Sequence, residues 1–405
     1  MRILQVCNKP PYPPRDGGSL AMFSLARALH ALGHKITVLT MFTDKHKLTR
    51  EHHLEYTKIM EVHTIYVDAG LKLKGLLFNL LFSDKPYTAS RFYSLQFERE
   101  LVKLLKSNEI DIIQLEGLYL TPYIKLIRNN SDALIALRAH NVEHEIWTRI
   151  AAEEKGFYRK LYFTLLAKRL RRFEEEALNS YDLLIPITER DNEKFRIMGN
   201  KKPSHVCPAG VDIKNTDPGN NEVPQERYSP FTLFYLGSLD WIPNQEGLLW
   251  FVSKVFPGLR QKFPDLKLHI AGRNAPQSLI RQLDVHGVVF HGEINDPDEF
   301  SREHTVMIAP CFSGSGMRLK IIEAMALGKP VVTTSIGAEG LIAVNMEHIM
   351  IANEPEPFSE CIERLIKYPD LCHQMGRNAY RIVYGRYNNN DIAIALAEFY
   401  KQQLK

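Results

Sequence analysis

The chain has 405 residues, of which 45% are hydrophobic and 24% charged. This is ordinary usage for a soluble globular protein, and the length predicts two or three domains. The formal net charge of +4 at pH 7 is too small to demand a nucleic-acid partner, although it favours anionic ligands locally. The five cysteines include no Cys-x-x-Cys pair, which argues against a disulfide framework or a zinc site and for a reducing compartment.

No part of the sequence is typical of a secretory or membrane-spanning segment. The N-terminus begins at once with a strand pattern rather than a signal peptide, and the most apolar run, residues 75–82, is too short to span a bilayer. We therefore expect a cytoplasmic protein. Peripheral contact with the inner face of the membrane remains an option.

The first half of the chain alternates strand and helix patterns. Buried-type strands are predicted at residues 2–7, 35–40, 111–117, 133–140 and 181–188. Between the first two strands, a Pro- and Gly-rich loop leads into a helical pattern that ends on Gly33. This order predicts a parallel βαβ unit with a right-handed crossover.

The pattern restarts after residues 213–230, which are rich in Pro, Asn and Gly as a linker would be. Strands are predicted in FTLFYLGS, LKLHIAG, GVVFHGE, TVMIAP and PVVTTS, and helices in NQEGLLWFVSKVFPGLRQKF and RLKIIEAMALG. The sequence thus predicts an α/β protein with two doubly wound domains in tandem. Ligands bind beyond the carboxyl ends of such strands, so the chemistry is expected in the loops that follow them.

The first such loop carries Gly17 and Gly18 just before the first helix, with Ser19 as the expected N-cap. Two glycines allow close backbone approach, and a helix N-terminus offers free N–H groups to an anion. The loop lacks the GxGxxG fingerprint and a Walker A lysine. Taken alone, the pair is more typical of a tight turn than of a binding site.

Two further loops carry chemistry-bearing residues. His140, at the end of a strand, can donate a hydrogen bond to a sugar hydroxyl or a reacting group, although a structural histidine is a serious alternative. His144 follows four residues later, but no third metal ligand is evident, so a structural role fits it better. Asp296 and Asp298 have the DxD spacing of some cation sites, yet their position predicts helix capping.

The most specific segment is PCFSGSGMRLKIIEAMALGKPVV, residues 310–332. Its small residues permit close approach, and the helix after them presents its positive end. Arg318 and Lys320 add cations suited to phosphate oxygens, and Glu323 can accept hydrogen bonds from a ribose diol. A capped amphipathic helix with a solvated face explains the helix. It explains less well why small residues and cations gather at one strand end.

With these motifs together, the whole chain resembles the GT-B-fold retaining glycosyltransferases of family 4 (glycosyl transferases group 1), in a subgroup with a modified E-x7-E motif. The matching segments appear in the family's order: PPYPPRDGGS, ALGHKITVLT, RAHNVE, CPAGVD, FYLGSLDWIPNQEGLLWF, LHIAG and SGSGMRLKIIEAMALGKPVVTTSIGAEGL. The resemblance implies two Rossmann-like domains facing a central cleft. Their expected bounds are 1–212 for the acceptor-side domain, 213–230 for the linker and 231–385 for the donor domain, with a helix at 386–405 that packs back on the N-domain.

The resemblance also implies residue roles. Glu323 matches the second Glu of the E-x7-E motif, which binds the donor's ribose, and His140 matches a histidine near the transferred sugar. Further donor-binding positions implied in the same way are Gly17, Gly18, Gly237, Gly272, Gly316 and Met317.

This chain departs from the family pattern in two places. Ser315 stands where the first Glu of E-x7-E is expected. In the loop after the first C-domain strand, Ser238 and Asn244 stand at or near the positions of the family's diphosphate-binding Arg and Lys. We hypothesise that Arg318 and Lys320 replace these cations and act at the diphosphate. Because they are two residues apart, both reach one phosphate only if the first helical turn is irregular.

The resemblance implies transfer of a sugar from a nucleotide-diphosphate sugar to a saccharide or lipid-linked saccharide, with retained anomeric configuration. A role in cell-surface polysaccharide or glycolipid biosynthesis is expected. Protein donors would stabilise the leaving diphosphate, so neither a metal nor another cofactor is expected. No residue stands out as a general base. A non-catalytic sugar-nucleotide-binding module and a nucleotide-sugar epimerase remain the alternatives.

Two segments of the N-domain pair basic with apolar side chains. Residues 70–87 and residues 158–173 both have the composition of helices that lie on anionic bilayers. A helix packed on the sheet with a solvated basic face is an equal alternative for residues 158–173.

Overall fold

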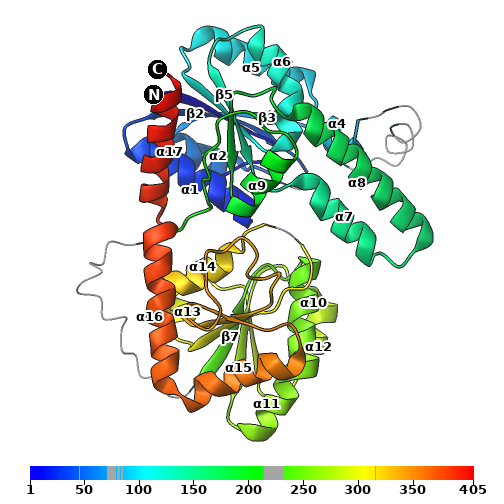
Figure 1. Ribbon diagram of the computed structural model, residues 1–405, viewed down its shortest axis with the longest axis vertical. Helices are drawn as coiled ribbons and strands as arrows, with labels where there is room; N and C mark the ends of the chain where they lie inside the picture. The colour runs from blue at the N-terminus through cyan, green and yellow to red at the C-terminus, as the bar shows by residue number, and fades with distance from the viewer. Residues whose placement is uncertain (45, 71–78, 80–82, 84, 214–230, 315) are drawn as a thin grey trace. The chain divides into compact units, whose positions relative to one another are not determined.

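The computed structural model describes residues 1–405 except 45, 71–78, 80–82, 84, 214–230 and 315. The described chain forms two compact units, residues 1–209 with 389–405 and residues 210–388. Each unit is built on a six-stranded parallel sheet (Figure 1). The two α/β sheets are the doubly wound architecture that the alternating pattern predicts.

The sheet of the first unit has the order β3-β2-β1-β4-β5-β6. Its strands are β1 (Arg2–Cys7), β2 (Lys35–Phe42), β3 (Glu61–Tyr66), β4 (Ile112–Glu116), β5 (Leu134–Ala139) and β6 (Leu183–Pro186). Both sides of the central strands are apolar: Leu4 and Val6 belong to one core cluster, and Ile3 and Cys7 to another. Helices therefore cover both faces, as a parallel sheet requires.

Helices of the first unit divide between the two faces. They are α1 (Gly17–Ala31), α2 (Arg50–Thr57), α4 (Tyr87–Ser90), α5 (Leu95–Ser107), α6 (Ile124–Arg128), α7 (Glu143–Glu153), α8 (Phe157–Ala177), α9 (Glu189–Ile197) and α17 (Asn389–Gln403), with a 3₁₀ turn at Leu118–Tyr123. The last helix, α17, lies along α1 (Figure 1). It buries Ile392, Leu396 and Tyr400 in the same core cluster as Met22 and Leu25 of α1.

The start of α1 differs from the expectation that Ser19 caps it. The helix begins at Gly17, and Asp16 is its N-cap, with a side-chain oxygen that accepts from the Ser19 backbone N–H at 2.8 Å. Asp is a better cap here because its carboxylate also pairs with Lys9 at 2.7 Å. Gly17 and Gly18 are thus the first helical residues rather than a loop before the helix.

In the second unit the strand order is β12-β11-β10-β7-β8-β9. The strands are β7 (Thr232–Leu236), β8 (Lys267–Ala271), β9 (Val288–Gly292), β10 (Val306–Ala309), β11 (Val331–Thr333) and β12 (Met350–Ile351). The helices are α10 (Ile242–Trp250), α11 (Phe256–Lys262), α12 (Gln277–Leu283), α13 (Pro297–Arg302), α14 (Leu319–Ala326), α15 (Pro355–Lys367) and α16 (Pro369–Arg386). Leu268 and Ile270 of β8 join the core that includes α10, α11, α12 and α15, so His269 faces the opposite side.

The single helix expected at residues 244–263 is interrupted. Helix α10 ends at Trp250, a π-helical turn spans Phe251–Val255, and α11 begins at Phe256. Pro257 lies in the first turn of α11, where its missing N–H costs nothing. A proline inside a continuous α-helix would instead lose a hydrogen bond and clash with the preceding turn, which accounts for the widened turn.

Among the described helices, none combines the length and hydropathy needed to cross a bilayer. All five cysteines are free thiols.

Candidate active site

The loop between β10 and α14 is held by Arg318. This residue is the N-cap of α14 and has a non-helical backbone (φ −89°, ψ 86°). Its guanidinium turns back to donate to the carbonyl of Gly316 at 2.9 Å and that of Ser313 at 3.3 Å. Gly314 and Gly316 have positive φ values of 92° and 82°, a conformation that favours glycine. The small residues and Arg318 together define the shape of this loop.

Lys320 points away from that loop, towards the end of β7. Its ammonium donates to the Tyr235 hydroxyl at 2.9 Å and to Oδ1 of Asn244 at 3.0 Å, and it lies 4.3 Å from the centre of the Tyr235 ring. Burial, with a smaller effect from Arg318, lowers the pKa of the Lys320 ammonium to about 7. The structure therefore separates the two cations: Lys320 reaches the loop after β7, and Arg318 turns back on the loop before α14.

Gly237 and Gly272 allow two strand ends to touch. A Cβ atom on Gly272 would lie 2.0 Å from the carbonyl oxygen of Gly237, far inside van der Waals contact. A Cβ atom on Gly237 would lie 3.5 Å from the Lys320 ammonium, at the limit of ordinary contact. Both glycines thus lie at the carboxyl edge of the sheet, and Gly237 borders the Lys320 side chain.

Glu323 is half-buried in the second turn of α14. Burial, and then the negative charge of Asp298, raise the pKa of its carboxyl above the ordinary value. Asp298 belongs to α13, which is capped by Asp296 through hydrogen bonds from the backbone N–H groups of Asp298 and Glu299 at 2.9 and 3.0 Å. The DxD pair is therefore a helix cap, as its position predicts.

In the first unit, Lys9 lies at the carboxyl edge of the sheet. Its ammonium holds both oxygens of Asp16, at 2.7 and 2.8 Å, and would be 3.0 Å from a Cβ atom on Gly18. Burial opposes ionisation of Asp16, but Lys9 and the Ser19 N–H outweigh it and lower the pKa of Asp16 to about 2. The N-terminus of α1 is therefore already occupied by this ion pair.

His140 belongs to a buried polar network at the ends of β4 and β5. Its Nε2 atom lies 2.7 Å from Glu116, whose side chain is fully buried and also 3.5 Å from the Arg138 guanidinium. Burial disfavours the Glu116 carboxylate, but Arg138 and His140 hold its pKa at about 2. An ionised carboxylate only accepts hydrogen bonds, so His140 donates through Nε2–H.

Burial lowers the pKa of His140 despite the nearby carboxylate, so the ring is neutral at pH 7. A neutral imidazole protonated at Nε2 has its lone pair on Nδ1. This nitrogen is left as the acceptor for a ligand hydroxyl. The sequence predicted His140 as a donor to a ligand; in this network its Nε2–H is donated to Glu116, and Nδ1 is the nitrogen that can accept.

Glu143, in the first turn of α7, has a shifted pKa and was not singled out from the sequence. Burial, with a contribution from the charge of Glu174, raises its pKa to about 7, although the Tyr119 hydroxyl donates to it at 2.8 Å. Its position in the sequence, three residues after His140 at the end of a strand, could have identified it. His144 pairs with Glu174 at 2.6 Å, so the two histidines serve different carboxylates and form no metal pair with each other.

The family model of Glycosyltransferase Family 4 matches residues 15–215, and that of Glycosyl transferases group 1 matches residues 230–368. The chain belongs to this glycosyltransferase family. The first match covers most of the first unit, and the second match lies within the second unit. Together they include every site residue described above except Lys9.

One curated relative and two solved structures match nearly the whole length of the glycosyltransferase. A Klebsiella pneumoniae protein described as an uncharacterized 44.6 kDa protein in the cps region is 25% identical over 96% of this chain and 97% of its own. Anabaena HepE, solved in complex with UDP, has a TM-score of 0.70 at 15% identity and covers 99% of this chain and 100% of its own. Sucrose-phosphate synthase from Thermosynechococcus elongatus has a TM-score of 0.69 at 17% identity, over 100% and 99%. The fold is GT-B.

The structure brings the predicted site residues of this glycosyltransferase into two groups. Gly237, Gly272, Gly316, Lys320 and Glu323 lie in the loops and the first two helical turns at one edge of the second sheet. Gly17, Gly18 and His140 lie at the corresponding edge of the first. Met317 directly precedes the N-cap of α14, and Ser315 lies outside the described residues.

Proposed function

We propose that the protein transfers a sugar from a nucleotide-diphosphate sugar to a saccharide or lipid-linked saccharide, with retention of anomeric configuration and without a metal ion. The observation that carries this proposal is the position of Lys320. Its ammonium lies at the loop after β7, against Gly237 and Asn244, where a donor diphosphate needs a cation.

The donor side would work by fixed electrostatics. Lys320 and the N-terminus of α14 present positive charge to the diphosphate, while Arg318 holds the loop in shape. Donors that are in place before reaction stabilise the charge that develops on the leaving diphosphate. Glu323, one turn further along α14, is left to bind the ribose diol.

On the acceptor side, two groups suit proton transfer. His140 offers Nδ1 as an acceptor, and Glu143 has a pKa of about 7, close to the value at which a group exchanges protons at neutral pH. We propose that His140 orients the transferred sugar. The departing diphosphate takes the acceptor proton.

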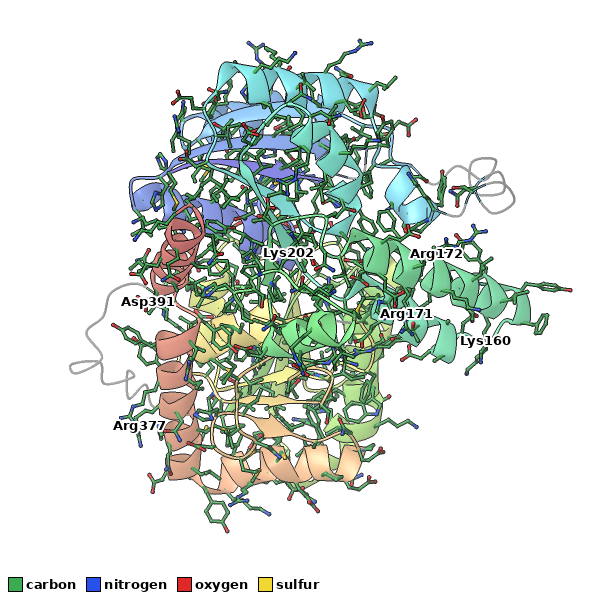
Figure 2. The ribbon with its side chains drawn as sticks, turned by 45° about the horizontal axis from the view of Figure 1, so that its top comes forward. Lys160, Arg171, Arg172, Lys202, Arg377 and Asp391 are labelled. Atoms are coloured by element: carbon green, nitrogen blue, oxygen red, sulfur yellow. The ribbon has the colours of Figure 1, made fainter. Side chains whose placement is uncertain are left out.

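A lipid-linked acceptor is supported by the hairpin of α7 and α8. Phe157, Tyr158 and Leu161 at the start of α8 are 75%, 84% and 62% exposed. Lys160 lies beside them, while Arg171 and Arg172, further along the same helix, pair with Glu175 and Glu176 (Figure 2). Exposed aromatic and aliphatic side chains beside cations suit an anionic membrane surface. We propose peripheral contact there, on the inner face of the membrane, in cell-surface glycan assembly. The other segment with this composition, residues 70–87, lies largely outside the described residues.

The decisive experiment measures nucleoside diphosphate release. The protein is incubated with a panel of nucleotide sugars, beginning with UDP-sugars because of the HepE complex, each with and without membrane lipid extract. We expect release that depends on acceptor. Conversion of donor without acceptor would indicate an epimerase, and binding without turnover would indicate a non-catalytic module; either result would overturn the proposal.

Two variants locate the activity. Glu323→Gln keeps the size of the side chain but loses the charge, and it should lower turnover through weaker donor binding. Glu360→Gln changes an exposed residue of α15 in the same unit and should leave release unchanged.

A further inference from the structure

Three histidines of the second unit lie together outside the proposed donor site. They are His269 in β8, His291 in the edge strand β9, and His304 in the turn between α13 and β10. One ring nitrogen from each lies within 4.8 Å of the others. Nδ1 of His269 and Nε2 of His291 are 2.9 Å apart, and the ring centres of His269 and His304 are 4.1 Å apart.

His304 has an unusual environment for a polar side chain. It is 6% exposed, and among the described residues neither of its ring nitrogens has a hydrogen-bond partner. Phe300 packs edge-on against it at 4.6 Å. A buried polar group without a partner costs free energy and calls for an explanation, such as a bound ion.

The ligand atoms of the cluster suit a cation rather than an anion. Burial, followed by repulsion between the rings, lowers the pKa of His269 and of His304 to about 4. An imidazole binds a metal through a ring-nitrogen lone pair, and three such nitrogens lie within 4.8 Å of one another here. An anion would need them protonated.

Two lysines approach the same histidines. Lys267 and Lys329 both act on the cluster electrostatically, but the Lys329 ammonium is engaged with the carbonyl of Arg302 at 2.9 Å. Their repulsion reduces the affinity for a cation without removing the three nitrogen ligands.

We propose that His269, His291 and His304 bind one divalent transition-metal ion of the zinc type, with water in the remaining position. Three imidazole nitrogens and an open position are a common zinc coordination set, and imidazole suits this class of metal. Exposed His291 leaves a route for entry. Metal binding breaks the hydrogen bond between Nδ1 of His269 and Nε2 of His291. The proton of that hydrogen bond moves to the other nitrogen of the same imidazole ring, so that both facing nitrogens can bind the metal.

This metal would act on the scaffold and not on the transferred sugar. It would tie β8, β9 and the α13–β10 turn together. Strand β8 ends just before Gly272, and α13 carries Asp298, which acts on Glu323. The proposal is therefore compatible with sugar transfer that needs no metal in the reaction itself.

The test uses untagged full-length protein stripped with a chelator and dialysed against zinc. We expect one zinc ion per chain by elemental analysis, and a higher Tm with zinc than with chelator. His291→Gln retains a hydrogen-bonding group but loses the ligand, and it should weaken zinc binding about tenfold or more. His286→Gln, at an exposed histidine just before β9, is the matched control and should bind as the wild type does.

A second variant distinguishes loss of a metal ligand from misfolding. His291→Cys restores a metal ligand, so it should recover zinc binding and, with cobalt, add a thiolate charge-transfer band that the wild type lacks. If the wild type retains no zinc, or if His291→Gln binds as tightly as the wild type, the proposal fails and the cluster is only a packed set of rings. Because this readout is metal content, its failure is independent of glycosyltransferase activity.

Discussion

The ammonium of Lys320 and Oδ1 of Asn244 are 3.0 Å apart, which joins α14 to the first turn of α10. The resemblance predicts a lysine near the position of Asn244, and in this structure the ammonium beside Asn244 comes from a different helix. The side chain of Asn244 also donates to the carbonyl of Ser238 at 2.8 Å. The cation at this loop is therefore Lys320 of α14 and not a residue of the loop itself.

Replacing Lys320 tests this arrangement. Lys320→Met should weaken nucleoside diphosphate binding about tenfold or more at about pH 6. In the wild type, affinity should fall as the pH rises through about 7, because the Lys320 pKa is about 7 and the ammonium loses its charge there. Calorimetric titration at several pH values measures both effects. Lys254→Met, at an exposed lysine of the same unit, is the control, and an equal pH profile in Lys320→Met would contradict the assignment.

The same pKa affects folding in a defined direction. The folded protein loses the Lys320 proton near pH 7, whereas an unfolded lysine keeps it until about pH 10.4. Between these values the unfolded chain binds more protons, so the contribution of Lys320 to the free energy of unfolding rises with pH. Lys320→Met should remove that rise, which denaturant unfolding at two pH values would detect.

His140→Ala should lower kcat and leave the affinity for free nucleoside diphosphate nearly unchanged. The imidazole lies on the first unit, next to Glu116, whereas the proposed diphosphate site belongs to the second. The fold should survive, because Glu116 keeps Arg138 and the side-chain amides of Gln5 and Gln114 as partners. Steady-state kinetics and nucleotide titration separate the two effects, and a loss of nucleotide affinity as large as the loss in kcat would argue against this assignment.

Gly272→Ala should destabilise the second unit by about 3 kcal/mol, since its Cβ atom would lie 2.0 Å from the Gly237 carbonyl oxygen. Gly258→Ala is a matched control: Gly258 lies in α11 with no atom within 4 Å of the added Cβ. That variant should be neutral or more stable by about 0.5–1 kcal/mol. Urea unfolding measures both, and equal midpoints for the two variants would show that the strand ends can separate freely.

Leu161→Glu should reduce sedimentation with anionic liposomes at low salt. Leu161 is 62% exposed on α8, so a charge there should not disturb the core. Ile197 of α9 is 69% exposed outside the hairpin, and Ile197→Glu should sediment as the wild type does. Equal loss in both variants would point to added negative charge alone. If the wild type does not bind the liposomes, the hairpin of α7 and α8 is not a membrane-binding surface.

The strands with continuous apolar runs could be predicted from sequence, because burial on both faces leaves a simple pattern. Strand β3 was missed since EVHTIY mixes polar and apolar residues, and β12 since it has only two residues. The cap of α1 was assigned to Ser19 instead of Asp16. Several residues there favour capping, and the ion pair with Lys9 that decides between them depends on the folded loop.

The sequence could predict which loops carry the candidate site, but it could not predict which side chains contact one another there. The end of a strand identified His140, and the glycine-rich loop before a helix identified Glu323. The partners of Lys320 belong to a strand and a helix more than seventy positions earlier, so local pattern could not reveal them. The same limit applies to the three histidines, which come from two strands and a turn.

The hydroxyl of Tyr400 in α17 donates to Gln114 at 2.8 Å, and Gln114 in turn donates to Glu116. The first unit thus takes its final helix from the end of the chain, after the whole second unit. During synthesis, the ribosome must finish all of residues 210–388 before the apolar side of α1 can be covered. The nascent protein therefore passes through a long interval with an incomplete first domain, in which it depends on chaperones or on rapid completion of the chain.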